Sequence, residues 1–473
     1  MSDPAIPLCV DLDGTLTRAD FLFESFFVLL KQQPLSIFLC LFWLLRGKAY
    51  LKEQIALRVT LDVGVLPYNS QLVDYLREAR SAGRPIYLCT AANQRFASQV
   101  AAHFGMFSGV LASNASLNLH GENKAAALVE QFGEHGFDYC GDARADVPVW
   151  QRARRAIVVG NRHIANIARK VNTETVFFED KRRLVPLMLK EMRVHQWVKN
   201  CLIFVPLLLG HRFEDLQAVL AACIAFASFS LCASSVYLLN DMLDLDADRR
   251  HPRKHSRPFA SGKLPLSLGI VLTIVLLGAG LGLAALLPWQ FGAVLVGYMA
   301  ATVAYSFVLK RIALIDVFTL AGLYTVRVIA GGECNNIPLS YWLILFSVPI
   351  FLSLAMLKRY VELEAMLQQG KTEAAGRGYI TQDMSILRSY GTAAGYLAVL
   401  VLALYLNSPE FKLLYHHPKM LWAVFVLTLY WVSRIWMLAF RGQMNDDPIV
   451  FTFKDPVSAG VIGLCGVFMV LAI

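Results

Sequence analysis

Apolar runs of bilayer-crossing length recur through the C-terminal part of the chain, and they restrict its fold more than any other feature. A helix needs about 20 apolar residues to cross the hydrocarbon core of a membrane. Only 17% of the residues are charged, against roughly 25% in soluble domains. The sequence therefore predicts an all-α polytopic membrane bundle of nine transmembrane helices, at residues 198–214, 217–239, 267–287, 289–308, 312–331, 340–357, 391–407, 420–440 and 456–473.

Basic residues in the connections predict the side of the membrane that each loop faces. They gather after the second, fourth, sixth and eighth runs, whereas the opposite loops carry only Arg212, Lys412 and Lys419. Because loops rich in Lys and Arg stay in the cytoplasm, we expect the first set there. This order requires the short first run to cross, so nine spans fit and eight do not. The same clustering argues against nucleic acid as a partner, despite a net charge of +9.

Residues 1–178 follow another pattern, in which short apolar runs alternate with polar-faced helical stretches. Such runs, bounded by glycine and polar residues, are typical of buried parallel strands, and they lie at residues 6–10, 85–89, 109–112, 139–140 and 156–159. We expect a soluble α/β Rossmann-like domain, then an amphipathic basic linker at 179–197 suited to an anionic membrane surface, then the bundle of residues 198–473. Without an export signal, this domain is expected in the cytoplasm.

An insertion at about residues 16–80 is expected to form a helical cap. It contains two apolar runs, 21–30 and 35–45, that are too short to cross a bilayer alone. Two interpretations fit equally: cap helices that touch the membrane surface, or a buried helical hairpin. The nine cysteines have no C-x-x-C spacing, which favours reduced packing residues over a zinc site or a disulfide framework.

An acidic motif closes the second membrane run. On a helix the side chains of Asn240, Asp244 and Asp248 stack on one face, with Asp241 beside them. Carboxylates this close repel one another unless a cation lies among them, and oxygen ligands completed by substrate phosphates are typical of Mg²⁺. Donors for phosphate oxygens follow at Arg249, Arg250, Arg253, Lys254 and Arg257. A solvated loop of mixed charge would explain these basic residues, but not the acidic spacing.

The motif resembles the N-D-x-x-D-x-x-x-D signature of the UbiA superfamily of intramembrane prenyltransferases. That family carries a second Asp-rich motif after the sixth helix, and residues 357–364 here contain no Asp pair. The sequence is more similar to the polyprenyl-phosphate phosphoribosyltransferase branch. The matching segments are 196–200, 251–258, 309–310, 327–332 and 358–362, together with Asp316.

This resemblance implies transfer of 5-phosphoribose from phosphoribosyl diphosphate to a polyprenyl phosphate. Mg²⁺ can stabilise the charge on the departing pyrophosphate, and basic side chains can bring the two anions together. The Mg²⁺ ligands would be Asn240, Asp241, Asp244 and Asp248, the last two also catalytic. The substrate-binding residues would be Lys199, Asn200, Arg253, Lys254, Arg257, Lys310, Arg327, Lys358, Arg359 and Glu362. Asp316 and Arg327 should point into the bundle, with a purely structural role as the open alternative.

A second acidic constellation lies in the soluble domain. Its members, Asp11, Asp13, Thr90, Lys124, Asp142 and Asp146, follow predicted strands or begin a helical stretch. Across residues 6–160, their order resembles that of the motifs in the haloacid dehalogenase superfamily. In that superfamily, an Asp two residues after the nucleophile marks phosphatases.

The likeness implies a role for each of these residues. Asp11 would be the phosphoryl-accepting nucleophile and Asp13 the general acid and base. Thr90 and Lys124 would bind the phosphoryl group. Mg²⁺ would be held by Asp11, Asp142, Asp146 and the backbone carbonyl of Asp13. A degenerate domain that serves only in folding or docking is the alternative.

Together the two parts predict a bifunctional enzyme of the bacterial inner membrane, with both active sites cytoplasmic. The phosphatase would convert polyprenyl-phosphoryl 5-phosphoribose into polyprenyl-phosphoryl ribose. By resemblance alone, this product suits the supply of ribose- or arabinose-type sugars to the cell wall. Two alternatives stay open. One is a prenyltransferase that uses a prenyl diphosphate donor on an aromatic or other acceptor, and the other is a membrane scaffold that binds phosphorylated partners.

Overall fold

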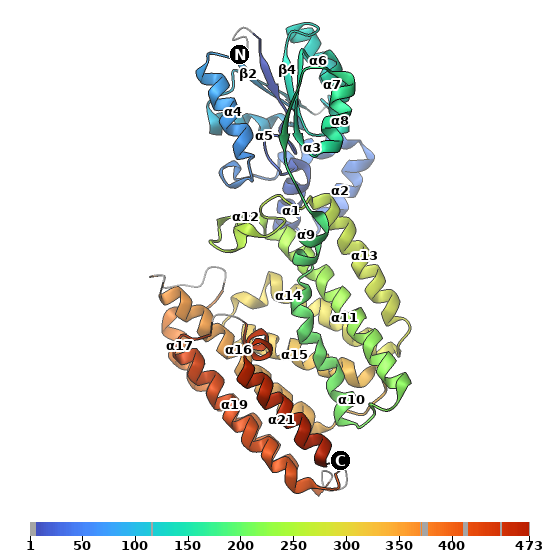
Figure 1. The fold of residues 1–473 in the computed structure, drawn as a ribbon, viewed down its shortest axis with the longest axis vertical. Helices are drawn as coiled ribbons and strands as arrows, with labels where there is room; N and C mark the ends of the chain where they lie inside the picture. Colours follow the sequence, from blue (N-terminus) through green and yellow to red (C-terminus); the bar gives the residue numbers. More distant parts are fainter. Residues whose placement is uncertain are drawn as a thin grey trace. The chain divides into compact units, whose positions relative to one another are not determined.

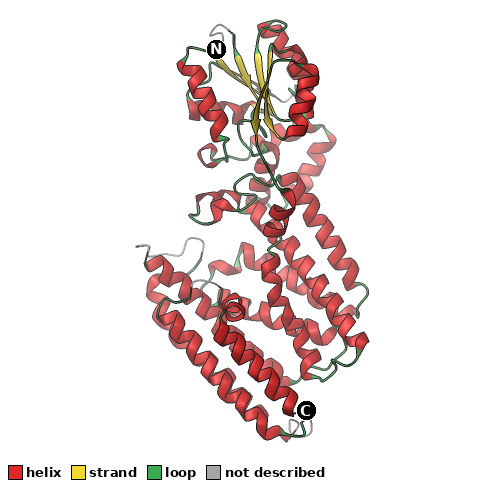
Figure 2. Cartoon of the chain, in the orientation of Figure 1, coloured by secondary structure: helices red, strands yellow, loops and turns green. Residues whose placement is uncertain are grey.

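The computed structural model describes residues 6–114, 117–368, 370, 377–409, 415–444 and 447–472. Figures 1 and 2 trace the chain, coloured by sequence and by secondary structure. It divides into two compact units. Unit 1 comprises Met1–Met192 and Tyr237–Ile274, and unit 2 comprises Arg193–Val236 and Val275–Ile473. Unit 1 therefore contains the acidic motif and the loop after it, in addition to the N-terminal domain.

A six-stranded parallel sheet with strand order β3-β2-β1-β4-β5-β6 forms the centre of unit 1. The strands are β1 (Leu8–Val10), β2 (Ile86–Asn93), β3 (Gly109–Ser113), β4 (Asp138–Gly141), β5 (Arg155–Gly160) and β6 (Thr175–Glu179). The first five confirm the strands predicted from short apolar runs. Strand β6 was not predicted, and its residues are all only partly buried. An edge strand like this one lacks the continuous apolar run of a central strand.

Helices cover both faces of the sheet (Figure 1). On one face α4 (Ser70–Ser81) and α5 (Gln94–Phe104) pack with Leu8 and Val10 of β1. On the other face Cys9 of β1 packs in a core formed with the remaining helices, α6 (Glu122–Phe132), α7 (Val147–Arg152) and α8 (Arg162–Val171). Successive side chains of a strand point to opposite faces, which explains how β1 serves both cores.

The insertion between β1 and β2 is helical, as predicted. It contains α1 (Phe21–Gln32), α2 (Ser36–Leu45), α3 (Lys48–Ala56), the 3₁₀ turn η1 (Val63–Val65) and α4. Helix α1 buries Phe21, Phe27 and Leu29. Helix α2 and its flanks expose apolar side chains instead, with Phe38 at 68% and Leu45 at 86% exposure. A buried hairpin therefore does not describe α2, and its contact with a membrane surface stays a prediction.

The remaining part of unit 1 begins at the end of α11 (Leu216–Leu243). It continues through α12 (Leu245–Arg250) and η4 (Lys254–Ser256) to the first turns of α13 (Leu266–Ala284). Asp244 stands between α11 and α12 as an N-cap residue with non-helical backbone angles. The single helical face predicted for the acidic motif is thus interrupted at one residue. The N–H groups of Asp244 and Asp248 still donate to the carbonyls of Asn240 and Asp244, at 3.0 and 2.8 Å, so the four-residue spacing is retained.

Seven helices in the described residues are long and apolar enough to cross a membrane. They are α11, α13, α14 (Trp289–Phe307), α15 (Ile315–Glu333), α16 (Tyr341–Leu367), α17 (Met384–Leu406) and α19 (Trp422–Phe440). The helices α20 (Pro448–Lys454) and α21 (Pro456–Ala472) meet at 80° and add an eighth span if they count as one. The part of the chain that the structure describes therefore contains a helical bundle of the membrane type, with seven to eight helices able to span a bilayer.

The prediction of nine spans is not confirmed. The first predicted run forms the 3₁₀ helix η3 (Val194–Phe204) and the short α10 (Val205–Leu209), of 11 and 5 residues. This apolar stretch is shorter than the roughly 20 residues of a full α-helical span. The predicted orientation depended on that crossing and stays a prediction. In unit 2 the core gathers between α15, α16, α17 and α19, around Leu354, Leu357 and Ile435.

Candidate active sites

Carboxyl groups converge in unit 1 where the neighbouring strands β1 and β4 end. Asp11 directly follows β1, and Asp142 and Asp146 follow β4. Each of the three offers an oxygen within 4.8 Å of the other two. Among the residues that the structure describes, no other group of three or more Asp, Glu, His or Cys side chains is this close. The structure thus brings together Asp11, Asp142 and Asp146 as predicted, whereas Asp241, Asp244 and Asp248 of the second predicted Mg²⁺ site form no such group among the described residues.

Lys124, near the start of α6, adds a positive charge to this group. Its Nζ lies 2.9 Å from Asp11 Oδ2 and 3.7 Å from Asp146 Oδ1. It also donates a hydrogen bond of 2.8 Å to the hydroxyl of Tyr139, which in turn donates to Asp146 at 2.9 Å. Burial works to lower the pKa of Lys124, but the charges of Asp11 and Asp146 outweigh it and raise that pKa. Lys124 is therefore charged.

Burial and mutual repulsion raise the pKa values of the carboxyls in this group. Burial raises the pKa of Asp11 to about 6, with Lys124 opposing the rise and Asp146 adding to it. Burial, then the negative charges of Asp146 and Asp11, raise the pKa of Asp142 to about 8. Buried carboxylates repel one another in this way until a cation compensates them. A divalent cation would favour the ionised form of these carboxyls, and oxygen ligands of this kind fit Mg²⁺.

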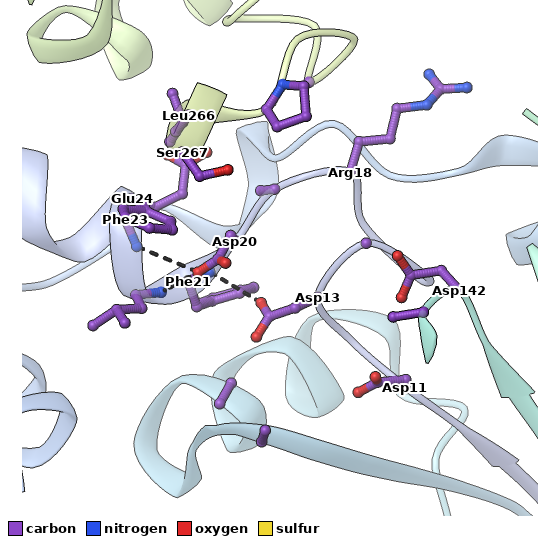
Figure 3. Close-up of a pocket in the computed structure, with 18 of the residues that line it drawn as sticks. Asp11, Asp13, Arg18, Asp20, Phe21, Phe23, Glu24, Asp142, Leu266 and Ser267 are labelled. Atoms are coloured by element: carbon purple, nitrogen blue, oxygen red, sulfur yellow. Dashed lines mark hydrogen bonds between the residues drawn. The ribbon is translucent and has the colours of Figure 1, made fainter. Parts of the chain in front are cut away.

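Asp13 lies on the opposite side of the chain turn from the metal-binding group. Its carboxylate accepts a hydrogen bond of 2.9 Å from the N–H of Phe21, the first residue of α1 (Figure 3). Burial and the charge of Asp20 raise the pKa of Asp13 well above its usual range, which favours the protonated form that a general acid needs. Thr90 is buried on β2, where its hydroxyl accepts a hydrogen bond of 3.0 Å from the N–H of Ala92.

Gly14 allows the turn after Asp13 to approach the acidic group. Its φ is +75°, and a Cβ at this position would lie 2.3 Å from Asp142 Oδ2. Only glycine adopts this backbone without strain and leaves room for the carboxylate. The Gly that follows Asp13 in the sequence thus has a steric reason.

A cavity of about 380 Å³ adjoins these groups. Asp11, Asp13, Lys124, Asp142 and Asp146 line one side of it. Helix α1 contributes its first turn, and Lys52 of α3 also reaches the cavity. The last contribution comes from the segment that leads into α13, through Phe259, Gly262, Leu264, Pro265, Leu266 and Ser267. Figure 3 shows Leu266 and Ser267 near Phe23 and Glu24, across the cavity from Asp11 and Asp142.

Basic side chains of unit 1 pair with the acidic motif. An Nη atom of Arg257 lies 2.8 Å from Asp241 and 2.6 Å from Asp248, both buried carboxylates. Lys254 lies 3.8 Å from Asp248, and Lys31 of α1 lies 2.6 Å from Asp244. Asn240 lies on α11 just before these residues, and Arg253 is exposed. In this structure the carboxylates of the acidic motif are therefore paired with basic side chains, and their role as Mg²⁺ ligands stays a prediction.

In unit 2, Lys199 and Lys358 share one carboxylate. Their Nζ atoms lie 2.9 and 2.8 Å from the same Oδ2 atom of Asp447. Two cations against one carboxylate leave a net positive charge, which is the requirement for binding a phosphate. Sequence reasoning missed Asp447, although its position directly before Pro448 is a helix N-terminal signal. Asp447 caps α20 through the N–H of Ile449.

A second polar group in unit 2 is centred on Arg327 of α15. Its guanidinium donates to Asn200 Oδ1 at 2.8 Å and to the hydroxyl of Tyr298 at 2.9 Å. It also lies 5.8 Å from the ring centre of Tyr324, and Lys199 Nζ lies 5.7 Å from the same ring. The structure thus gathers Lys199, Asn200 and Arg327 around one aromatic side chain.

A third polar group ties α15 to α16. Arg359 donates to Asp316 through two nitrogens, to Glu362 at 2.5 Å and to the hydroxyl of Tyr305 at 2.7 Å. Asp316 and Arg359 are both buried. Asp316 and Arg327 are both buried, as expected. They belong to separate polar groups, since Asp316 contacts Arg359 and Tyr305 whereas Arg327 contacts Asn200 and Tyr298. With two carboxylates beside it, Arg359 is well placed to join helices. Its role in substrate binding stays a prediction. The same holds for Lys310, which lies in η5 (Leu309–Arg311).

Comparisons with known proteins find two different domains in the chain. The model of the UbiA prenyltransferase family matches residues 201–454, and that of the haloacid dehalogenase-like hydrolases matches residues 53–151. The chain belongs to the UbiA prenyltransferase family. Its UbiA domain follows an N-terminal haloacid dehalogenase-like (HAD-like) domain.

Three relatives resemble the UbiA-family chain over different lengths. An uncharacterized protein of Sinorhizobium fredii, y4nM, is 39% identical over 459 residues, 96% of this chain and 89% of that protein. The nodulation protein NoeC of Azorhizobium caulinodans is 38% identical over 56% of this chain and 85% of its own length. The decaprenyl-phosphate phosphoribosyltransferase of Mycobacterium tuberculosis is 38% identical over 204 residues, 42% of this chain and 67% of that protein.

Aromatic hydroxyls are the other site residues that sequence reasoning missed. Tyr139 in the HAD-like domain and Tyr305 in the UbiA domain each join a basic side chain to a carboxylate, and the hydroxyl of Tyr298 accepts a hydrogen bond from Arg327. All three lie within apolar segments, where the tyrosine ring suits a core position. Their sequence pattern therefore contains no signal that separates a packing role from a polar one.

Proposed function

We propose that this protein transfers 5-phosphoribose from phosphoribosyl diphosphate to a polyprenyl phosphate and then removes the 5-phosphate, giving polyprenyl-phosphoryl ribose. Membership of the UbiA family and the likeness to a decaprenyl-phosphate phosphoribosyltransferase support the first reaction. The single observation that carries the second is the group of Asp11, Asp142 and Asp146 with Lys124, placed beside a cavity of substrate size.

In the transferase reaction, Asn240, Asp241, Asp244 and Asp248 would hold Mg²⁺. The ion supplies positive charge to the departing diphosphate. Arg257 already contacts two of these carboxylates, so it can turn its remaining donors toward phosphate oxygens. Lys199 and Lys358 would bind the acceptor phosphate through the positive charge that Asp447 leaves uncompensated. The phosphate of the acceptor is already an anionic nucleophile, so this step needs no strong base.

In the phosphatase reaction, a carboxylate oxygen of Asp11 attacks the phosphorus of the 5-phosphate. The bond from phosphorus to the sugar oxygen breaks, and Asp13 gives its proton to that oxygen. Lys124 offsets the charge of the phosphoryl group, and Mg²⁺ on Asp11, Asp142 and Asp146 would supply further positive charge. Asp13 then takes a proton from water, whose oxygen attacks the phosphorus, and inorganic phosphate leaves as Asp11 is regenerated. Loss of the phosphate makes the overall sequence irreversible.

We further propose that both reactions occur at the cytoplasmic face of a bacterial inner membrane. Phosphoribosyl diphosphate is a soluble anion, so its site must be open to the compartment that contains it. The basic loops of the UbiA domain support this orientation. A dephosphorylated ribosyl lipid would suit the supply of ribose- or arabinose-type sugars for the cell wall.

The test uses purified full-length protein in detergent with Mg²⁺, a polyprenyl phosphate and labelled phosphoribosyl diphosphate, with lipid products followed by mass spectrometry. Wild-type protein should form a ribosyl lipid without its 5-phosphate. Asp11→Asn should accumulate the phosphorylated lipid, whereas Asp248→Asn should form neither. Asp74→Asn, at an exposed position on α4, is the matched control and should behave as wild type.

The alternative reaction is prenyl transfer, which the family name favours. Prenyl diphosphate with an aromatic acceptor should give no product under the present proposal. Prenylated acceptor, with no ribosyl lipid from wild-type protein, would replace the proposal by this alternative.

A further inference from the structure

Part of the UbiA domain lines the cavity of the HAD-like domain. The segment after the acidic motif contributes Phe259, Gly262, Leu264, Pro265, Leu266 and Ser267 to this cavity. All of these residues belong to unit 1, together with Asp11 and Lys124. We call residues 259–267 the cap segment, which is separate from the helical cap of residues 16–80. The HAD-like domain thus lacks part of the wall of its own active-site cavity, and the UbiA domain supplies it.

The cap segment makes a close backbone contact with the HAD-like domain at Gly262. Its φ is +66°, and a Cβ there would lie 2.6 Å from Arg18 Cβ and 2.9 Å from Pro67 Cγ. The N–H of Arg18 donates to the carbonyl of Pro67 at 3.0 Å, so these neighbours are themselves joined. No side chain larger than that of glycine fits here unless the cap segment moves away from the HAD-like domain.

A buried arginine also holds the cap segment. Arg249 of α12 donates two hydrogen bonds to the carboxylate of Glu24, at 3.1 and 2.5 Å, and a third of 3.0 Å to the carbonyl of Ala260. The side chains of Arg249 and Glu24 are only 4% and 2% exposed. Glu24 belongs to α1, which lines the same cavity. The distance between the cap segment and Asp11 is therefore set by buried contacts.

The cap segment also leads directly into a membrane helix. Leu266 and Ser267, the first residues of α13, line the cavity, and α13 is one of the helices apolar and long enough to cross a bilayer. The cavity therefore adjoins the end of a membrane span. A substrate with a lipid chain, in contrast to a free sugar phosphate, would enter from this direction.

Two arginines at the cavity bear on what such a substrate would carry. Arg18 and Arg182 both line it and both pair with Asp180, at 3.1 and 2.7 Å. Two guanidiniums against one carboxylate leave one positive charge, and both side chains keep about a quarter of their surface exposed. Arg18 is also the residue that Gly262 contacts. This charge suits a second anionic group, separate from the phosphate that would bind at Asp11 and Lys124.

We infer that the cap segment, with Arg18 and Arg182, selects a lipid-linked sugar phosphomonoester as the substrate of the phosphatase site. The terminal phosphate binds at Asp11 and Lys124, the phosphodiester that joins sugar to lipid binds Arg18 and Arg182, and the lipid extends toward α13. This inference rests on the phosphatase activity proposed above. It adds that a free sugar phosphate, which cannot reach the two arginines, is a poor substrate.

The test compares two substrates of the full-length protein in detergent with Mg²⁺: farnesyl-phosphoryl 5-phosphoribose and ribose 5-phosphate. The measured quantity is the ratio of kcat/KM for the lipid to kcat/KM for the free sugar phosphate. Wild-type protein should give a ratio well above ten. Gly262→Ala displaces the cap segment and should lower the ratio at least tenfold. Arg182→Gln removes the excess charge and adds no bulk, and it should also lower the ratio, mainly through KM for the lipid.

Gly105→Ala is the matched control. Gly105 has a φ of +64°, close to that of Gly262, but a Cβ there would meet nothing within 4 Å. It carries the same backbone strain without moving the cap segment, so its ratio should stay within threefold of wild type. Ratios within threefold of wild type for both Gly262→Ala and Arg182→Gln would overturn the inference and leave the phosphatase intact. If wild-type protein hydrolyses neither substrate, the phosphatase proposal fails, and the inference fails with it.

Discussion

The buried ion pair between Glu24 and Arg249 permits a quantitative prediction for unit 1. Arg249→Met keeps much of the side-chain length but leaves the Glu24 carboxylate, 2% exposed, without its partner. Removal of one member of a buried pair costs about 3–5 kcal/mol. Burial already raises the pKa of Glu24, with Arg249 opposing. Without Arg249 the carboxylate can take up a proton, which limits the cost, so we expect the lower end, about 3 kcal/mol.

Amide hydrogen exchange followed by mass spectrometry measures this loss locally. Since each 1.4 kcal/mol is a factor of ten, about 3 kcal/mol corresponds to roughly a 150-fold rise in the opening of the segments that the pair holds. We expect protection of α1 in Arg249→Met to fall about 100-fold in detergent-solubilised protein. Helix α8, on the far face of the sheet, serves as the internal reference and should keep its protection.

The neighbouring residue provides the control. Arg250 pairs with Asp62 at 2.6 Å, but their side chains are 59% and 44% exposed, and exposed pairs contribute about 0–1 kcal/mol. Arg250→Met should therefore change the protection of α1 less than about fivefold. The double variant Glu24→Gln/Arg249→Met, which removes both charges, should regain much of the lost protection. Equal effects of Arg249→Met and Arg250→Met would refute the reasoning.

Three further predictions concern stability and metal binding. Burial works to raise the pKa of Asp138, but its hydrogen bonds to two arginines outweigh this and lower the pKa. The stability from a lowered carboxyl pKa is present above the ordinary value and is lost as pH falls through the lowered one. Asp138→Asn should therefore reduce the unfolding temperature more at pH 7 than at pH 3, and equal reductions would contradict this. Arg359→Met leaves the buried carboxylate of Asp316 without its main partner in the bundle, and should lower the monodisperse yield on size exclusion, whereas an unchanged yield would show that the pair is dispensable. Millimolar Mg²⁺ should raise the unfolding temperature of wild-type protein through the acidic group of the HAD-like domain, and Asp142→Asn should remove most of that rise. A rise of the same size in the variant would place the metal elsewhere.

Local patterns in the sequence were sufficient for the class of each part. The strands of unit 1 followed from short apolar runs because a buried parallel strand needs apolar residues on both faces. That Asp11 and Asp142 lie close together was implied only by the resemblance to the haloacid dehalogenases, since the pairing of β1 with β4 is a property of the tertiary structure. The edge strand β6 lacks such a run and was missed. The first predicted membrane run was too short to decide by composition whether it crosses.

Contacts between distant parts of the chain were beyond that reasoning. Glu24 and Arg249 stand 225 positions apart, and each taken alone is typical of an exposed charged residue. Asp447 joins Lys199 and Lys358 only because separate helices meet at its position. The cap segment follows a motif that indicates transferase chemistry, yet it lines the cavity beside Asp11. Periodicity and spacing are local properties of a sequence. The packing of the whole unit, in contrast, decides which loop closes a cavity and which charge meets which partner, since many residues contribute to it together.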